Sequence, residues 1–172
     1  MSSPQSGVSN DLTLERTLQA PRMAIWRCWT EPKLMELWFC PKPWFVRDVS
    51  LELRAGGANH MTMCGPNGES FPNQGVYLHV EEGKRLVFTD AFTSAWQPSG
   101  KAFMVGDINL ADAPGGGTLY KAVARHWNAQ DRAEHEKMGF HQGWGIAADQ
   151  LEACVPCMAR IQSGASPDTR PM

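Results

Sequence analysis

The N-terminal part of the chain alternates hydrophobic and polar residues with the period of a β-strand. From Asp11 to Gln19 the leucines share one face with Arg16, while threonine and glutamate occupy the other face. Pro21 is typical of a first helical position, and apolar residues then recur at helical spacing up to Thr30. Thr30 can cap a second short helix over residues 32–39. The pattern therefore predicts one strand followed by two short helices.

The middle of the chain predicts a series of consecutive antiparallel strands. Segments rich in valine, phenylalanine, tryptophan and leucine alternate with short runs of glycine, proline and charged residues, which favour turns. Pro41 and Pro43 end the preceding helix because proline lacks a backbone N–H. The expected strands cover residues 44–53, 58–64, 75–81, 85–93, 103–111 and 118–127.

After Asn128 the period changes from that of a strand to that of a helix. Residues of one face recur every three or four positions, namely Met138, His141, Trp144, Ala148, Leu151 and Val155. The pattern predicts a single C-terminal helix of about 25 residues that ends before Pro156. Gly139, Gly143 and Gly145 permit a bend in it or a close approach of its backbone.

These elements predict one α+β domain over residues 11–157. Consecutive antiparallel strands have one face to bury, and the C-terminal helix is the only element long enough to cover it. A curved antiparallel sheet of about six to seven strands, wrapped around this helix, would leave a cavity where small molecules bind. Residues 1–10 and 158–172 are rich in polar residues, glycine and proline and are expected to be disordered.

Composition and charge narrow the classes of partner. The formal net charge is −2 and the longest basic run is Lys84-Arg85, so nucleic acid is not an expected partner. The chain lacks an apolar run of ~20 residues and a signal peptide, which predicts a cytoplasmic protein without membrane insertion. The five cysteines are odd in number and scattered, which favours reduced thiols. A homodimer is compatible with the sequence.

A family resemblance rests on seven short motifs, in their order and spacing: Ala20-Pro21, Ile25-Trp26, Trp29-Thr30-Glu31-Pro32, Leu37-Trp38-Phe39, Leu53-Arg54-Ala55-Gly56-Gly57, Leu86-Val87-Phe88-Thr89 and Gly116-Gly117-Thr118. From about Leu12 to Leu151 the chain resembles the START-like (SRPBCC) superfamily, in its branch named for homologues of the activator of heat-shock-90 ATPase. The resemblance implies the helix-grip fold, with a hydrophobic pocket between sheet and long helix. The superfamily includes lipid carriers, plant hormone binders, polyketide cyclases and aromatases, and a co-chaperone domain.

Aromatic and polar residues expected around this pocket form the candidate ligand site. They are Trp29, Trp38, Trp44, His60, Tyr77, Phe88, Asp90, Phe92, Tyr120, Met138, His141 and Trp144. His141 and Asp90 would be polar anchors among apolar walls, and Tyr77 or Tyr120 could polarise a carbonyl group. The alternative is ordinary core packing with satisfied hydrogen bonds, which is favoured for the histidine, the tyrosines and the tryptophans.

Neither a metal site nor a redox site is expected. His135 and His141 are six positions apart, so they do not share one side of a helix. Cys154 and Cys157 have the spacing of a redox pair, but they lie at a helix C-terminus, where the helix dipole does not lower a thiol pKa. No catalytic residue is assigned and no cofactor is expected.

Three functions are compatible with these observations. The first is binding of a small hydrophobic or aromatic molecule, which the sequence favours because it shows no strong catalytic constellation. The second is an enzyme of the cyclase, aromatase or hydrolase kind, with His141, Asp90 or a tyrosine as acid–base groups. The third is a co-chaperone-like interaction module, which would need an exposed apolar or charged patch.

Overall fold

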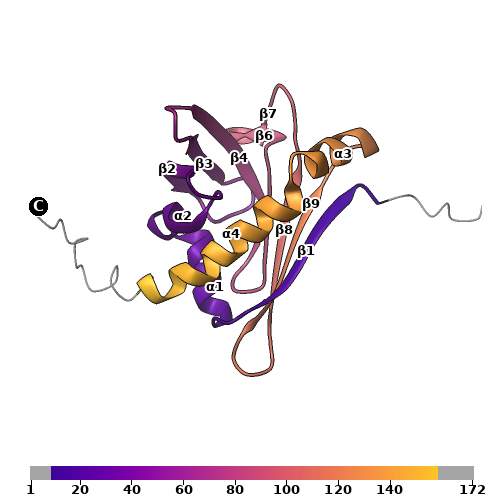
Figure 1. Ribbon diagram of the computed structural model, residues 1–172. Helices are drawn as coiled ribbons and strands as arrows, with labels where there is room; N and C mark the ends of the chain where they lie inside the picture. Colours follow the sequence, from indigo (N-terminus) through magenta and orange to yellow (C-terminus); the bar gives the residue numbers. More distant parts are fainter. Residues whose placement is uncertain (1–8, 159–172) are drawn as a thin grey trace, which may run out of the picture.

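A computed structural model describes residues 9–158 of the chain. The two segments expected to be disordered lie outside this range, except for Ser9, Asn10 and Met158. Seven strands form one antiparallel sheet in the order β1-β9-β8-β5-β4-β3-β2 (Figure 1). They are β1 (Asp11–Leu18), β2 (Phe45–Leu51), β3 (Ala58–Cys64), β4 (Ser70–Glu81), β5 (Arg85–Thr89), β8 (Val105–Asp112) and β9 (Thr118–Arg125). The predicted α+β architecture and strand number are confirmed.

One predicted strand is shorter than the sequence suggested. The expected strand over residues 85–93 ends at Thr89, because the next side chain, Asp90, turns to accept hydrogen bonds from the backbone N–H groups of Phe103 and Met104. The chain between them forms a small separate hairpin of β6 (Phe92–Thr93) and β7 (Gln97–Pro98), with the 3-10 turn η1 (Ser94–Trp96) at its tip.

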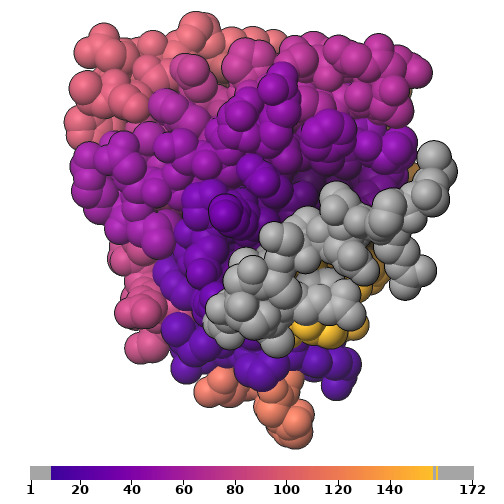
Figure 2. All heavy atoms as spheres, turned by 90° about the vertical axis from the view of Figure 1, so that its left-hand side faces the viewer, coloured from indigo at the N-terminus to yellow at the C-terminus, as the bar shows by residue number. Residues whose placement is uncertain are grey.

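Helices cover the concave face of the sheet. They are α1 (Arg22–Thr30), α2 (Pro32–Trp38), α3 (Ala129–Lys137) and α4 (Phe140–Cys154), followed by the 3-10 turn η2 (Val155–Cys157). In Figure 1, α4 runs diagonally across the sheet, with α1 beside it. Figure 2 faces α2 and the β2 edge, where indigo and purple atoms of the early helices and β2 lie below the magenta atoms of later strands. No helix within residues 9–158 is long and apolar enough to span a bilayer.

The prediction of a single C-terminal helix is wrong. Gly139 has a φ of 98°, in the left-handed region, and this residue separates α3 from α4. The break changes which side chains face the sheet. Phe140, Ala148 and Leu151 are buried, whereas Met138 is 76% exposed.

Arg16 is the polar residue among the leucines of β1, and it fastens α4 to the sheet. Its Nη1 donates a hydrogen bond to the carbonyl oxygen of Gly145 over 3.1 Å and forms an ion pair with Asp149. Glycine permits this approach, since a Cβ at Gly145 would lie 2.8 Å from the Arg16 Nη2 atom. Strand β1 and helix α4 are therefore joined by a polar contact that interrupts the hydrophobic pattern of the strand.

Candidate functional site

A small cavity lies between the inner face of strands β3 to β5, the two short helices and the loop after β5. Its volume is about 80 Å³. It is lined by Trp29, Met35, Phe39, Asn59, Met61, Asn73, Gly75, Tyr77, Leu86, Phe88, Thr89, Asp90, Phe103 and Met104. These residues belong to α1, α2, the strands and the loop. The expected cavity beneath the C-terminal helix is therefore displaced toward α1 and α2, because Phe140, Ala148 and Leu151 fill the space beneath α4.

Strand alternation aims five of these side chains at the same space. Asn59 and Met61 are two positions apart on β3, and Leu86 and Phe88 are two positions apart on β5. Tyr77 pairs in register with Phe88 and lies on β4, the strand between β3 and β5 in the sheet. The walls are mostly apolar, as is usual for ligand pockets.

Three buried polar atoms at the cavity make no hydrogen bond with any described residue. They are the Tyr77 hydroxyl, the Asn59 Oδ1 and the Trp29 Nε1. Tyr77 is 0% exposed, and burial raises the pKa of its phenol, so the hydroxyl stays protonated at neutral pH. Buried polar groups are normally satisfied, so these three atoms beside one cavity are able to pair with a polar group that enters it.

Tyr120, the second tyrosine, lies near the Trp29 indole without lining the cavity. Burial raises the pKa of Tyr120, and the nearby indole N–H lowers it by a smaller amount. The indole N–H nevertheless makes no hydrogen bond with any described residue. Of the three unsatisfied atoms, those of Tyr77 and Asn59 therefore provide the stronger indication of a ligand.

The rim of the cavity is held in place by hydrogen bonds to the backbone. Asp90 accepts from the N–H of Phe103 over 2.8 Å and from the N–H of Met104 over 3.2 Å. The Thr89 hydroxyl donates to the carbonyl oxygen of Met104 over 2.9 Å. Asp90 thus acts as a structural cap for the loop, and its carboxylate is at the same time the only charged group among the described lining residues.

Four of the predicted ligand-site residues line the cavity, namely Trp29, Tyr77, Phe88 and Asp90. The other three predicted tryptophans do not, and two of them lie near the short helices and β2. Trp38 is buried, and its Nε1 donates to the carbonyl oxygen of Cys28 over 2.9 Å. Trp44 stacks on Phe71, with 6.2 Å between ring centroids.

The remaining candidates also lie elsewhere. Phe92 packs against Trp96 in the β6–β7 hairpin, and Trp144 packs against Phe140. His60 follows Asn59 directly on β3, so alternation directs it to the opposite face of the sheet.

Two of the three residues predicted on the C-terminal helix, Met138 and His141, are exposed and do not line the cavity. Their predicted placement is wrong because the pattern was extrapolated through Gly139. The helix restarts at Phe140, which takes the buried position instead.

Several lining residues were missed by the sequence analysis. Asn59 and Met61 could have been predicted from the alternation of side chains along β3 if the inner face of that strand had been known. Asn73 lies near the start of β4, in the part of this strand before residue 75, where the predicted strand began. Phe103 and Met104 reach the cavity only through the tertiary contacts of Asp90, and no local pattern signals them.

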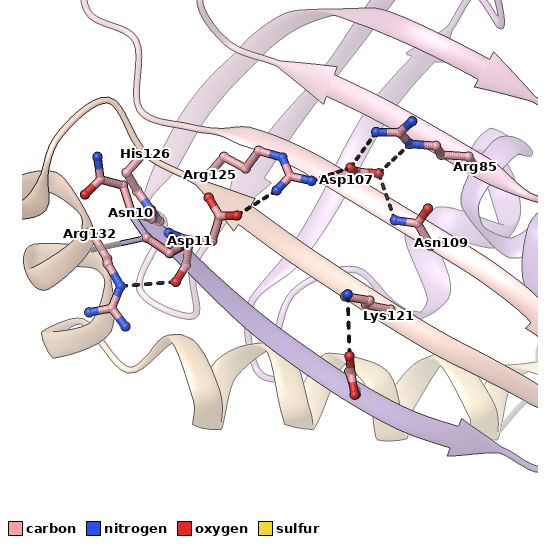
Figure 3. Close-up of polar contacts among 11 residues, drawn as sticks. Asn10, Asp11, Arg85, Asp107, Asn109, Lys121, Arg125, His126 and Arg132 are labelled. Atoms are coloured by element: carbon pink, nitrogen blue, oxygen red, sulfur yellow. Dashed lines mark hydrogen bonds and ion pairs between the residues drawn. The ribbon is translucent and has the colours of Figure 1, made fainter. Parts of the chain in front are cut away.

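A second polar cluster lies on the outer face of the sheet. Asp107 on β8 is 1% exposed and accepts hydrogen bonds from Arg85 on β5, Arg125 on β9 and Asn109 (Figure 3). Burial alone would raise the pKa of Asp107, but the hydrogen bonds and charges of the two arginines outweigh it and lower the pKa. Arg125 also pairs with Asp11 over 2.7 Å, so the cluster ties four strands together.

Two histidines meet where α3 packs against the end of β9. The His126 Nε2 and the His135 Nδ1 are 2.9 Å apart, and the His126 Nδ1 lies 2.8 Å from the carbonyl oxygen of Asn10. Burial, followed by the neighbouring His126, lowers the pKa of His135 to about 4. The ring of Phe103, from the cavity rim, lies 4.6 Å from the His135 ring. Within residues 9–158 no group of three or more histidines, cysteines and acidic residues is placed to hold a metal ion.

Cys154 contacts a cysteine that the sequence analysis did not pair with it. Its Sγ lies 3.4 Å from the Sγ of Cys28, and both residues are buried. Either thiol can donate in this contact, and the contact together with burial raises the pKa of the Cys28 thiol. The side chain of Cys157, the other half of the redox spacing, lies outside the described part of the chain.

The fold and its inner cavity define a protein of the helix-grip class. The family model for activator of Hsp90 ATPase homolog 1-like protein matches residues 19–156. The chain belongs to this family, as the seven sequence motifs indicated. No protein with a curated description matches the chain.

Solved structures of bacterial proteins share this fold. Protein NE0264 from Nitrosomonas europaea is 40% identical over 91% of this chain and 97% of its own, with a TM-score of 0.80. A protein from Rhodobacter sphaeroides is 18% identical over 88% and 96% of the two chains, with a TM-score of 0.75. An AHSA1-like protein from Aeromonas hydrophila is 18% identical over 94% and 99%, with a TM-score of 0.64. The last two likenesses concern the fold alone.

Proposed function

We propose that this protein binds a small hydrophobic or aromatic molecule in the cavity between strands β3 to β5 and the short helices. The observation that carries this proposal is a largely apolar cavity with unsatisfied buried polar atoms in its wall. An apolar wall contributes affinity by removing ligand surface from water, and a few polar groups orient the ligand.

An enzymatic role has less support from the same site. General acid–base catalysis needs at least two groups within hydrogen-bond reach of the reacting atoms. Among the described lining residues, Asp90 already caps backbone N–H groups. Tyr77 can donate a proton, but its raised pKa opposes action as a base. Binding without turnover does not require such a pair of groups.

The test is a thermal-shift and native mass-spectrometry screen of the purified protein against single-ring aromatics, flavonoids, sterols and fatty acids. A ligand at 100 times its Kd stabilises the folded state by about 2.7 kcal/mol, which is measurable as a higher Tm. We expect single-ring aromatics to raise the Tm and to form a one-to-one complex, because the cavity is small.

A pair of variants locates the binding. Met61→Phe adds bulk inside the cavity and should abolish the shift. Met63→Phe makes the same change two positions along the same strand, outside the cavity lining, and should leave the shift unchanged. Absence of a shift with every compound class, in protein shown to be folded, would overturn the proposed function.

A further inference from the structure

The size of the cavity limits what it can hold. Its volume of about 80 Å³ is smaller than the ~150 Å³ of an engineered cavity that takes up benzene. Phe103 at the rim is 37% exposed, and uptake of an aromatic ring would require its side chain to shift outward from its contact with His135. One aromatic ring is therefore the upper limit. Fatty acids and sterols, which need cavities of several hundred Å³, do not fit.

The unsatisfied atoms define the hydrogen bonds that a ligand must complete. The Tyr77 hydroxyl can both donate and accept, whereas the Asn59 Oδ1 can only accept. Asn59 pairs in register with Gly75, two positions before Tyr77, so the two side chains are diagonal neighbours on one face of the sheet. A ligand group that accepts from Tyr77 and donates to Asn59 satisfies both. A hydrocarbon leaves both unsatisfied, which costs affinity.

The charge of the cavity wall selects against anions. None of the described lining residues is a lysine, arginine or histidine. Within the described wall Asp90 provides the only formal charge, and the hydrogen bonds that it accepts from Phe103 and Met104 hold it at the rim. A carboxylate ligand would lose its hydration without gaining a positive partner, and it would lie near the carboxylate of Asp90.

We infer that the ligand is a neutral molecule with no more than one ring and with one protic group that both donates and accepts a hydrogen bond. Phenols, small alcohols and primary amides have this chemistry, and carboxylates do not. The inference rests on the proposed binding function and adds the chemical class of the ligand.

Four probes of similar size separate this inference from the proposed function. Phenol and benzamide carry the neutral protic group, toluene lacks a polar group, and benzoate carries a negative charge. We expect isothermal titration calorimetry of the full chain to show saturable binding of phenol and benzamide. Binding of toluene should be at least tenfold weaker, as one lost hydrogen bond predicts, and benzoate should not bind.

The two tyrosines of the chain provide a matched pair of variants. Tyr77→Phe removes the hydroxyl in the cavity and keeps the ring, so phenol should bind about tenfold more weakly while toluene is unaffected. Tyr120→Phe removes a hydroxyl that is also buried but does not line the cavity, and it should change neither affinity. Circular dichroism checks that both variants fold.

Three outcomes would contradict the inference. Equal affinity for toluene and phenol, together with no effect of Tyr77→Phe, would leave a purely apolar binding site. Preferential binding of benzoate would require a positively charged partner for its carboxylate, and the described cavity wall contains none. Either result overturns the ligand class and leaves the binding function standing, whereas failure of all four probes to bind folded protein overturns both.

Discussion

Phe88 on β5 and Gly106 on β8 stand opposite each other in register, and the Phe88 ring lies over the glycine. A Cβ at Gly106 would lie 2.4 Å from the ring carbons, which is far inside the van der Waals distance. Glycine at this position therefore makes room for the ring that forms one wall of the cavity.

The Gly106→Ala variant should consequently lose ligand binding. The added methyl group forces the Phe88 ring away from β8, and the overpacking should lower the free energy of unfolding by about 1–3 kcal/mol. Urea unfolding and titration with phenol would measure the two effects. Gly100→Ala is the control, because a Cβ there meets no atom within 4 Å. Unchanged phenol affinity in Gly106→Ala would show that the Phe88 ring does not form the wall.

The buried carboxylate of Asp107 should stabilise the fold only where it is ionised. Its pKa in the folded protein lies below the value of about 3.9 in an unfolded chain. Its contribution is therefore fully present above pH ~4 and is lost as the pH falls through the lower, folded-state pKa. Half-exposed arginine side chains cover it, and solvent screens the interaction, so we expect Asp107→Asn to cost about 1–3 kcal/mol at pH 7.

Urea unfolding of wild type and Asp107→Asn between pH 7 and pH 3 would test this. The difference in stability should shrink toward pH 3. Asp112→Asn removes an exposed carboxylate that pairs with Arg22, and it should change stability by less than about 1 kcal/mol. A constant difference between wild type and Asp107→Asn at every pH would contradict the electrostatic explanation.

His135 should make the fold less stable in mild acid. The unfolded chain takes up this proton near pH 6.5, while the folded protein takes it up only near pH 4. Stability is therefore highest above pH ~6.5 and falls between the two values, by about 1–2 kcal/mol after allowance for solvent screening. His135→Phe keeps a ring against Phe103 and should flatten the dependence of Tm on pH between 7 and 5. His79→Gln changes an exposed histidine, and a flattening of the same size there would contradict the assignment.

The sheet could be predicted because each strand buries one face, and burial produces an alternating pattern that is visible in the sequence. Leu12 and Leu14 on β1, or Leu86 and Phe88 on β5, show this directly. The loop after β5 could not be predicted in this way. It depends on the carboxylate of Asp90 meeting backbone N–H groups thirteen or more positions away, which is a tertiary contact.

The site residues that lie on strands could be predicted from the same alternation, and the others could not. Tyr77 and Phe88 lie on strands, and their alternation places them on the inner face. Asn59 was missed because alternation does not reveal which of the two faces of β3 is the inner one. The placement of His141 failed because helical periodicity was carried through a glycine that changes the direction of the chain.

Gly139 and Gly143 give the sharpest test of that break, because only one of them requires glycine. Gly139 has a φ of 98°, and a side chain in the left-handed region costs about 1–2 kcal/mol. Gly143 lies inside α4, and a Cβ there would meet only the Pro41 Cγ at an ordinary 3.9 Å. Gly139→Ala should therefore lower the free energy of unfolding. Gly143→Ala should raise it by about 0.5–1 kcal/mol, because alanine favours a helix over glycine. Urea unfolding of both variants measures this, and a loss of equal size in the two would contradict a break located at Gly139.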